Sequence, residues 1–339
     1  MARRANDYDE DDVRVRPGRR GSRPRTRIRP AHEDAVPAFV TAVDRGRYRC
    51  LVAAGGPGER AVTAMRAREL GRKSVVVGDR VALVGDVSGA PDTLARIVRI
   101  EPRTSTLRRT ADDTDPFERV IVANADQLVV VTALADPEPR PRLIDRTLVA
   151  AYDAGMEPLL ALTKADLADP ADLVAEYAPL GVPYVVTERG GDLAAVRGRL
   201  SGRISVLVGH SGVGKSTLVN ALVPDAERAV SHVNAVTGRG RHTSSSALAL
   251  ELPGRDGWII DTPGVRSFGL AHVDPANVID AFEDLAEGAA ERCPPRCDHL
   301  RDDCGLDGWV ADGRASRARL DSLRRLLRAR EGGDDAGDA

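Results

Sequence analysis

A glycine-rich octapeptide constrains the fold of this 339-residue sequence more than any other feature. It lies between a strand-like apolar run, 204–208, and a helical stretch, 217–222. Such glycines let backbone N–H groups turn toward phosphates, and the N-terminus of the following helix adds partial positive charge. Lys215 is then placed for the β- and γ-phosphates of a nucleotide, and the hydroxyl of Ser216 for Mg²⁺. The expected nucleotide-binding residues here are Gly209, His210, Ser211, Gly212, Val213, Gly214, Lys215, Ser216 and Thr217.

A second motif fits the phosphate end of the same site. Asp261-Thr262-Pro263-Gly264 ends the apolar run 258–260, which is typical of a buried strand. An acid in this position can hold Mg²⁺ through water, and the N–H of the glycine can contact a γ-phosphate. Because the motif follows both a strand and the phosphate loop, we expect Asp261 and Gly264 to bind nucleotide rather than to form an ordinary turn.

The stretch 238–244 between these motifs is rich in glycine and arginine and ends in hydroxyl residues, as switch loops do. Thr243, or Ser244 in the neighbouring register, would complete the Mg²⁺ shell when a γ-phosphate is present. Val265 stands where a water-orienting glutamine is common, so intrinsic hydrolysis should be slow. His242 is the candidate substitute for positioning water, although a loop histidine without a catalytic role fits the sequence almost as well. The predicted catalytic set is Lys215, His242 and Thr243.

Selection of the base is predicted from a four-residue guanine box, Thr163-Lys164-Ala165-Asp166, which follows the apolar run 159–162. The carboxylate of Asp166 can accept two hydrogen bonds from N1 and N2 of guanine, which adenine cannot supply. Such boxes commonly open with Asn, so Thr163 can soften affinity or selectivity, but Asp166 still favours GTP and GDP. The later Thr187 is a weak candidate for a second loop that contacts the base.

The order of these motifs is unusual, because the guanine box precedes the phosphate loop. All the parts are present, so the chain enters the nucleotide-binding domain halfway round. Such a circular permutation is tolerated because domain termini often lie close together. It also makes the switch and the Asp261 loop run directly into the C-terminal region, and we expect the nucleotide state to move that region.

Three of the four cysteines lie with one histidine inside twelve residues, in the pattern Cys-x3-Cys-x-His-x4-Cys. A Cys₃His set is typical of a closed structural Zn²⁺ site, which leaves no open position for chemistry. Buried free thiols are the alternative, and the clustering argues against them. The remaining Cys50 is predicted to be a small core residue. The expected metal ligands are Cys293, Cys297, His299 and Cys304 for one Zn²⁺ per chain, and Ser216, Thr243 and Asp261 for Mg²⁺.

Changes in sequence pattern divide the rest of the chain. Residues 1–35 are arginine-rich and predicted to be a disordered tail, which either solubilises the chain or binds nucleic acid. Short β-rich runs separated by turns predict a small β-barrel over 36–105. Alternating apolar runs and amphipathic stretches over 115–273 predict a mainly parallel sheet covered on both faces. Residues 274–330 are expected to form a helical zinc-binding part, and 331–339 an acidic disordered tail.

Charge and hydropathy exclude several classes of protein. The 49 basic and 51 acidic residues give a formal net charge of −2, which excludes a uniformly basic coat but not local basic faces. No apolar run is long enough to span a bilayer, and the N-terminus lacks an apolar signal region. We therefore expect a cytoplasmic chain without membrane contact, and nothing in the sequence indicates more than a monomer.

Over roughly residues 36–330 the sequence resembles the family of small-ribosomal-subunit-dependent GTPases called RsgA or YjeQ. The resemblance rests on the order of the boxes, on the stretch 240–243 (Gly-Arg-His-Thr), and on the Cys/His cluster. It implies an OB-type β-barrel, a circularly permuted α/β P-loop GTPase domain and a small helical zinc-binding domain. It also implies a GTPase that binds the small ribosomal subunit and its rRNA, assists late maturation of that subunit and is stimulated by it. Other assembly factors are further candidate partners.

The sequence departs from the family pattern in three places. The two larger gaps of the cysteine cluster are each one residue shorter than usual, the guanine box opens with Thr163, and the usual threonine triplet after His242 is Thr243-Ser244-Ser245. Two alternatives stay open. A permuted GTPase of the large subunit is disfavoured by the barrel and the cysteine cluster, and an RNA-binding scaffold with a relic nucleotide site is disfavoured by the intact phosphate loop.

Overall fold

The computed structural model leaves several predicted features outside the residues that it describes. Residues 1–31 and 331–339, which hold most of the predicted N-terminal tail and all of the C-terminal one, are among these features. The predictions made for both tails stay predictions. Within the described ranges, no helix has the length and apolar character needed to cross a bilayer. The described residues are 32–71, 74–109, 119–224, 226, 247–262, 270, 273–301 and 303–330. The predicted site residues outside them are His242, Thr243, Ser244, Gly264 and Val265.

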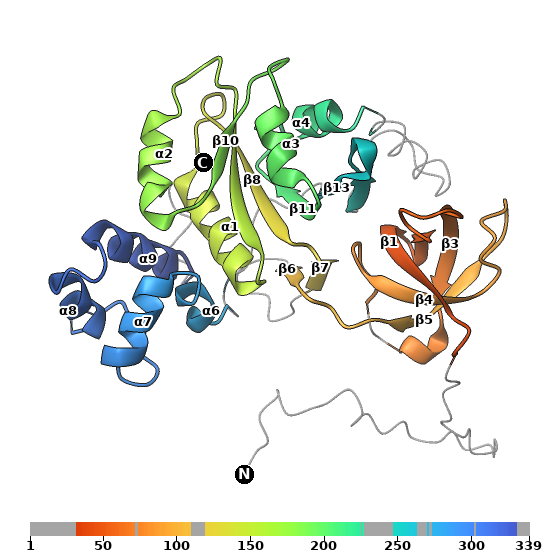
Figure 1. The fold of residues 1–339 in the computed structure, drawn as a ribbon, viewed down its shortest axis with the longest axis horizontal. Helices are drawn as coiled ribbons and strands as arrows, with labels where there is room; N and C mark the ends of the chain where they lie inside the picture. Colours follow the sequence, from red (N-terminus) through yellow and green to blue (C-terminus); the bar gives the residue numbers. More distant parts are fainter. Residues whose placement is uncertain are drawn as a thin grey trace, which may run out of the picture. The chain divides into compact units, whose positions relative to one another are not determined.

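The first body is a closed five-stranded β-barrel, drawn in red and orange (Figure 1). Its strands pair in the order β1-β2-β3-β5-β4, and β4 returns to β1 to close the barrel. Apolar side chains fill the interior, and Cys50 is fully buried among them, as predicted for a core residue. The predicted small barrel is therefore confirmed. Its strands are β1 (Val36–Asp44), β2 (Arg47–Val52), β3 (Arg60–Arg66), β4 (Arg80–Gly85) and β5 (Ala95–Ile100).

A hairpin that the sequence analysis did not predict follows the barrel: β6 (Thr106–Arg109) and β7 (Arg119–Ala123). The barrel loop at Gly78 packs tightly against its end, since a Cβ at Gly78 would lie 1.9 Å from the carbonyl oxygen of Ala123. The side-chain amide of Asn124 donates to the carbonyl of Gly78 at 2.9 Å. Only glycine fits this close approach, which joins the barrel loop to the hairpin.

The second body is a sheet in the order β10-β9-β8-β11-β13-β12. The first five strands are parallel and β12 is antiparallel, so the predicted mainly parallel sheet is confirmed. Because β11 lies between β8 and β13, strands from both halves of the chain meet at the centre. The strands are β8 (Gln127–Ala133), β9 (Glu157–Thr163), β10 (Tyr184–Val186), β11 (Arg203–Val208), β12 (Leu248–Glu251) and β13 (Gly257–Asp261).

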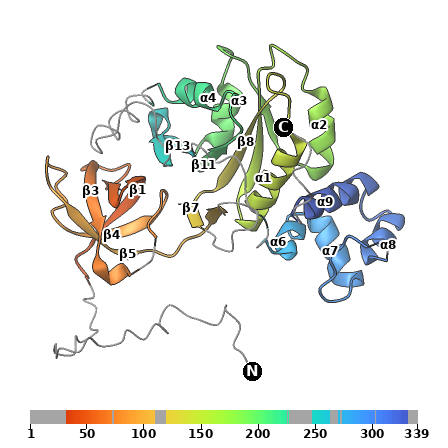
Figure 2. The same ribbon diagram turned by 180° about the vertical axis from the view of Figure 1, so that it is seen from behind.

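Helices cover both faces of this sheet (Figure 1; Figure 2). Along β8, Leu128 and Val130 join the core under α1 and α2, whereas Val129 and Val131 join the core under α3 and α4. A strand that is buried on both faces needs a continuous apolar sequence, which is why the motif-bearing strands were recognisable. The helices are α1 (Pro141–Asp153), α2 (Ala171–Tyr177), α3 (Ala194–Leu200) and α4 (Lys215–Leu222).

The C-terminal part is helical, as predicted: α6 (Pro275–Ile279), α7 (Glu283–Arg292), α8 (Gly305–Ala311) and α9 (Arg317–Arg330). The last helix begins at Arg317, because the Ser316 side-chain oxygen accepts a hydrogen bond from the Arg319 N–H at 3.1 Å and caps the helix. Four buried leucines form one apolar stripe along α9, and they share one core with α1. They are Leu320, Leu323, Leu326 and Leu327.

Candidate functional site

The phosphate loop connects β11 to α4, as the strand–loop–helix pattern predicts. Gly214 has φ of +86°, in the left-handed region that favours glycine. A Cβ at Gly209 would lie 2.5 Å from the carbonyl oxygen of Val131 on β8. These two glycines therefore let the loop turn tightly against the end of the neighbouring strand, and a side chain at either position would displace it.

Lys215 and Asp261 meet although they stand 46 positions apart. The lysine begins α4 and the acid ends β13, and its Nζ forms an ion pair with Oδ1 of the carboxylate. Both side chains are largely buried, with 13% and 21% of their surface exposed. Lys215 and Asp261, which were both predicted to lie at the phosphate end of the site, are thus in direct contact.

The guanine box ends β9 and lies against the phosphate loop. The hydroxyl of Thr163 is buried and donates a hydrogen bond to the carbonyl of Val213 at 2.6 Å. Lys164 has φ of +59°, which is uncommon for a residue other than glycine, and its Nζ donates to the carbonyl of Asp136. The carboxylate of Asp166 has no hydrogen-bond or ion-pair partner within the described ranges, so its oxygens are free to accept.

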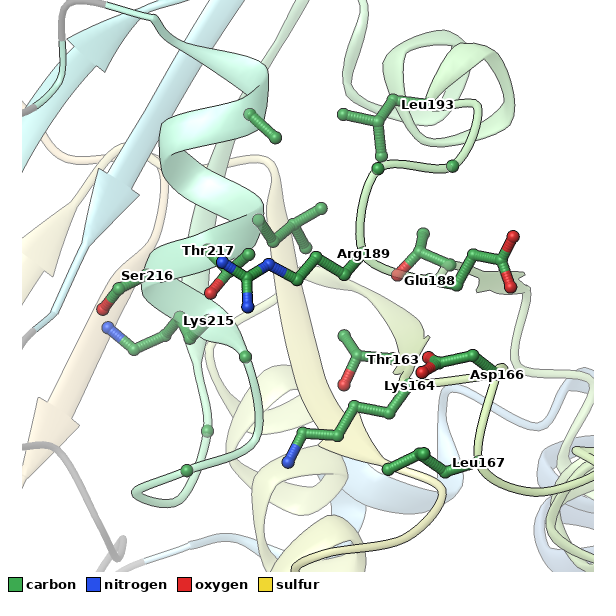
Figure 3. A pocket seen from close by; sticks show the side chains of 18 of the residues that line it. Thr163, Lys164, Asp166, Leu167, Glu188, Arg189, Leu193, Lys215, Ser216 and Thr217 are labelled. Carbon is green, nitrogen blue, oxygen red and sulfur yellow. The ribbon is translucent and has the colours of Figure 1, made fainter.

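These motifs line one pocket of about 730 Å³ (Figure 3). Its volume is within the usual range of small-molecule sites, roughly 300–1,000 Å³. Of the predicted nucleotide-binding residues that the structure describes, two are not part of its wall: Val213 packs in the core beneath the loop, and Ala165 packs against the core behind the guanine box. The predicted residues in the wall are Thr163, Lys164, Asp166, Gly209, His210, Ser211, Gly212, Gly214, Lys215, Ser216, Thr217 and Asp261.

The loop after β10 supplies another part of the wall, which the sequence analysis largely missed. Thr187, the weak candidate, is buried there, and its N–H donates to the carbonyl of Leu162 at 2.8 Å. Its carbonyl accepts from the N–H of Ala165 at 3.2 Å, so this loop is held against the guanine box. Glu188 and Arg189 follow in the same wall. They follow β10, and the structure places β10 beside β9, so both strands deliver their following loops to one edge of the sheet.

The four predicted zinc ligands converge on a separate site in the C-terminal part. Their ligand atoms all lie within 4.8 Å of one another. The Sγ atoms of Cys293 and Cys297 are 3.7 and 3.9 Å from Sγ of Cys304. Nδ1 of His299 is 3.6 Å from the Sγ atoms of Cys293 and Cys304. Tetrahedral zinc with Zn–S of about 2.3 Å and Zn–N of about 2.1 Å requires about 3.8 and 3.6 Å, so the set fits one Zn²⁺.

Burial also affects the protonation of the cluster. Burial raises the pKa of the Cys304 thiol to about 12, and it also raises the pKa of the Cys293 thiol. Burial lowers the pKa of His299, which favours the neutral form of its imidazole. Neutral thiols are poor ligands, so a divalent ion held by Cys293, Cys297, His299 and Cys304 would have to supply the charge that ionises the thiols. Arg324 fixes the loop by donating to the His299 carbonyl at 2.9 Å and pairing with Asp307 at 2.6 Å.

The amino-acid sequence is similar to those of known proteins. The family described as RsgA GTPase matches residues 100–271. A protein called small ribosomal subunit biogenesis GTPase RsgA, from Pseudomonas syringae pv. tomato, is 39% identical over 263 residues, 75% of this chain and 74% of that protein. One of the same name from Pseudomonas aeruginosa is 38% identical and covers 75% of each chain. The chain belongs to the RsgA GTPase family. As a member of that family it is a GTP hydrolase.

Solved structures match the fold. YjeQ from Thermotoga maritima aligns with a TM-score of 0.64 at 24% identity, covering 88% of this chain and 99% of that one. YloQ, described as a circularly permuted GTPase, aligns with a TM-score of 0.63 at 21% identity, covering 89% and 96%. The fold predicted from the box order is confirmed. In this RsgA-family chain the guanine box on β9 precedes the phosphate loop after β11, yet both reach one pocket.

Proposed function

We propose that this RsgA-family GTPase binds the small ribosomal subunit and its rRNA, assists late maturation of that subunit, and hydrolyses GTP faster when bound to it. The convergence of Asp166, Lys215 and Asp261 on one pocket carries the nucleotide part of the proposal. The ribosomal part is supported by relatives named small ribosomal subunit biogenesis GTPase that align over three quarters of the chain.

At the base end of the pocket, Asp166 accepts hydrogen bonds from N1 and N2 of guanine. Its carboxylate has no competing partner among the described side chains, which supports this role. Thr163 holds the guanine box to the phosphate loop through Val213. This contact replaces the support that an asparagine commonly gives, so guanine selectivity is retained despite the substitution.

At the phosphate end, Lys215 exchanges its contact with Asp261 for the β- and γ-phosphate oxygens. The exchange frees the carboxylate, and together with the hydroxyl of Ser216 it forms an oxygen donor set of the kind that Mg²⁺ prefers. Mg²⁺ held there would neutralise charge on the phosphates. Thr243, Gly264 and His242 keep their proposed roles as Mg²⁺ ligand, γ-phosphate contact and water-positioning group.

The remaining assignments concern the other parts of the chain. We assign the barrel to 36–105, the GTPase domain to 115–273 and the zinc-binding part to 274–330. One Zn²⁺ at the Cys₃His cluster holds α7, α8 and the loop between them. Ribosomal subunits are cytoplasmic in bacteria, and we propose the same location, and a monomer, for this chain.

Steady-state hydrolysis of GTP and ATP, measured alone and with purified small or large ribosomal subunits, tests the proposal. We expect slow GTP turnover, at least tenfold stimulation by small subunits only, and negligible ATP turnover. The Lys215→Ala variant, which lacks the phosphate-binding amine, should lose the stimulated turnover. Stimulation by large subunits instead would show that the small subunit is the wrong partner. ATP turnover as fast as GTP turnover would refute the role of Asp166 in selecting guanine. Subunit binding unaffected by nucleotide or by Lys215→Ala would favour a scaffold.

A further inference from the structure

One cation in the pocket wall is not accounted for by the phosphate loop, the guanine box or the Asp261 motif. Arg189 stands in the loop between β10 and α3, lines the pocket and is exposed. Figure 3 shows its side chain extending from that loop toward the first turn of α4, where Lys215, Ser216 and Thr217 lie. The neighbouring Glu188 points away from that turn.

The other cations of the pocket are engaged by the protein. Lys215 pairs with Asp261, and Lys164 donates to a backbone carbonyl. Arg189 has no hydrogen-bond or ion-pair partner among the described residues. A guanidinium is always charged and presents five donors in a planar fork that matches phosphate oxygens. Arg189 therefore brings unsatisfied donors into a cavity whose ligand is a polyanion.

The path of the side chain indicates which part of the nucleotide it meets. The guanine box and the Arg189 loop are held together by the bond from the Ala165 N–H to the Thr187 carbonyl. In Figure 3, Asp166 of the guanine box and Lys215 at the start of α4 lie on opposite sides of the pocket. A side chain that starts beside the base and extends toward the start of α4 passes the ribose. Lys215 serves the β- and γ-phosphates, so a guanidinium directed at the next residues of the helix reaches the phosphate nearest the ribose.

We propose that Arg189 is a nucleotide-binding residue that donates hydrogen bonds to the α-phosphate and so retains GDP and GTP equally. The inference rests on the proposed nucleotide site. It requires a contact with substrate in the ground state and assigns Arg189 no part in the hydrolytic step. Charge-assisted bonds of this kind are among the strong ones, so their loss should be measurable in affinity alone.

The test compares Arg189→Met, which keeps the apolar stem and removes the charge, with Arg199→Met. Arg199 is exposed on α3 and lies outside the pocket wall, so it controls for net charge. Calorimetric titration of the full chain with GDP, IDP and a non-hydrolysable GTP analogue should show affinity roughly tenfold or more lower in Arg189→Met for all three ligands. Arg199→Met should match the wild type. KM for GTP should rise by the same factor, with kcat within about twofold.

Each contrary result overturns the assignment in its own way. Unchanged affinity in Arg189→Met would exclude a charged contact. A loss confined to the GTP analogue would place the guanidinium at the γ-phosphate, and unequal losses for GDP and IDP would place it on the base. If the wild type bound no guanine nucleotide, the proposed function itself would fail. Wild-type binding with an unaffected Arg189→Met variant would refute only the role of Arg189.

Discussion

The nucleotide pocket and the Cys₃His cluster differ in how their polar groups are satisfied by the protein itself. In the pocket, Lys215 pairs with Asp261, an interaction that phosphate can replace, while Asp166 has no partner among the described residues. In the cluster, the four ligand atoms lie within 4.8 Å of one another, and His299 and Cys304 are buried. The first is built for a ligand that enters and leaves, and the second for an ion that stays.

A polar contact joins α1, which covers the sheet that carries the pocket, to α9 of the C-terminal part that carries the cluster. Arg325 of α9 lies 3.0 Å from Asp145 of α1 and 3.0 Å from Glu176 of α2. Asp145 is only 3% exposed, and its Oδ1 has no hydrogen-bond partner among the described atoms. The leucine stripe of α9 packs beside this contact in the shared core. Damage to the pocket or to the cluster should therefore lower the stability of the whole fold. It should not directly alter ligand binding at the other site.

Removing zinc should have the largest effect. In Cys304→Ser the thiolate set is broken, and structural zinc contributes on the order of 10 kcal/mol in small zinc domains. We expect zinc content to fall from one ion per chain to near zero, and amides of α7 and α8 to exchange rapidly with deuterium. Because no α6–α9 residue is among those lining the pocket, GDP affinity should stay within about threefold.

The matched control is Cys50→Ala in the barrel, which should keep one zinc ion per chain. Metal analysis and hydrogen exchange check both variants. Native protection of α7 in metal-free Cys304→Ser would show that the cluster is not a folding site. A large loss of GDP affinity would show that the two regions are not separable in the way the contact pattern suggests.

A smaller effect is expected inside the pocket from Thr163→Val. The substitution keeps the shape but leaves the buried carbonyl of Val213 without the hydroxyl donor at 2.6 Å, which costs about 1–3 kcal/mol. GDP affinity should fall about tenfold, measured by calorimetry. Thr187→Val is the control, because Thr187 lines the same pocket but makes only a long hydrogen bond. Its hydroxyl is 3.5 Å from the Leu162 carbonyl oxygen. Equal losses in both variants would contradict the loop-holding role of Thr163.

The smallest effect concerns pH and the contact between the regions. Burial, opposed in part by Arg325, raises the pKa of Asp145 to about 6. Because the unfolded pKa is about 3.9, the folded state holds this proton more tightly, and the resulting stabilisation is complete below about pH 4 and lost as pH rises through 6. The stability of the wild type relative to Asp145→Asn should therefore fall by roughly 1–3 kcal/mol between pH 4 and 7. Urea unfolding between pH 4 and 7 measures the free energy of unfolding of both proteins. An advantage of the wild type that rises with pH would contradict this prediction.

The parts of the site that the sequence predicted are those with local signatures. The phosphate loop needs Gly209 and Gly214 because their backbones pass too close for a side chain or adopt positive φ, and the cysteine cluster needs short spacing. The buried strands were predictable because both faces are apolar. The role of Arg189 depends instead on β10 lying beside β9, a tertiary relation with no local pattern. The hairpin β6–β7 is short and mixed in polarity, so it did not differ from a loop.

The position of β11 between β8 and β13 also has a consequence for how the chain is made. Translation delivers β8, β9 and β10 first, so the base-recognising half of the sheet can pair while the phosphate-binding half does not yet exist. Until residues 203–208 leave the exit tunnel, one edge of β8, apolar on both faces, has no strand to pair with. An apolar edge of this kind is a site for wrong pairing. The synthesis of residues 134–208 is thus the interval in which the nascent chain most needs protection.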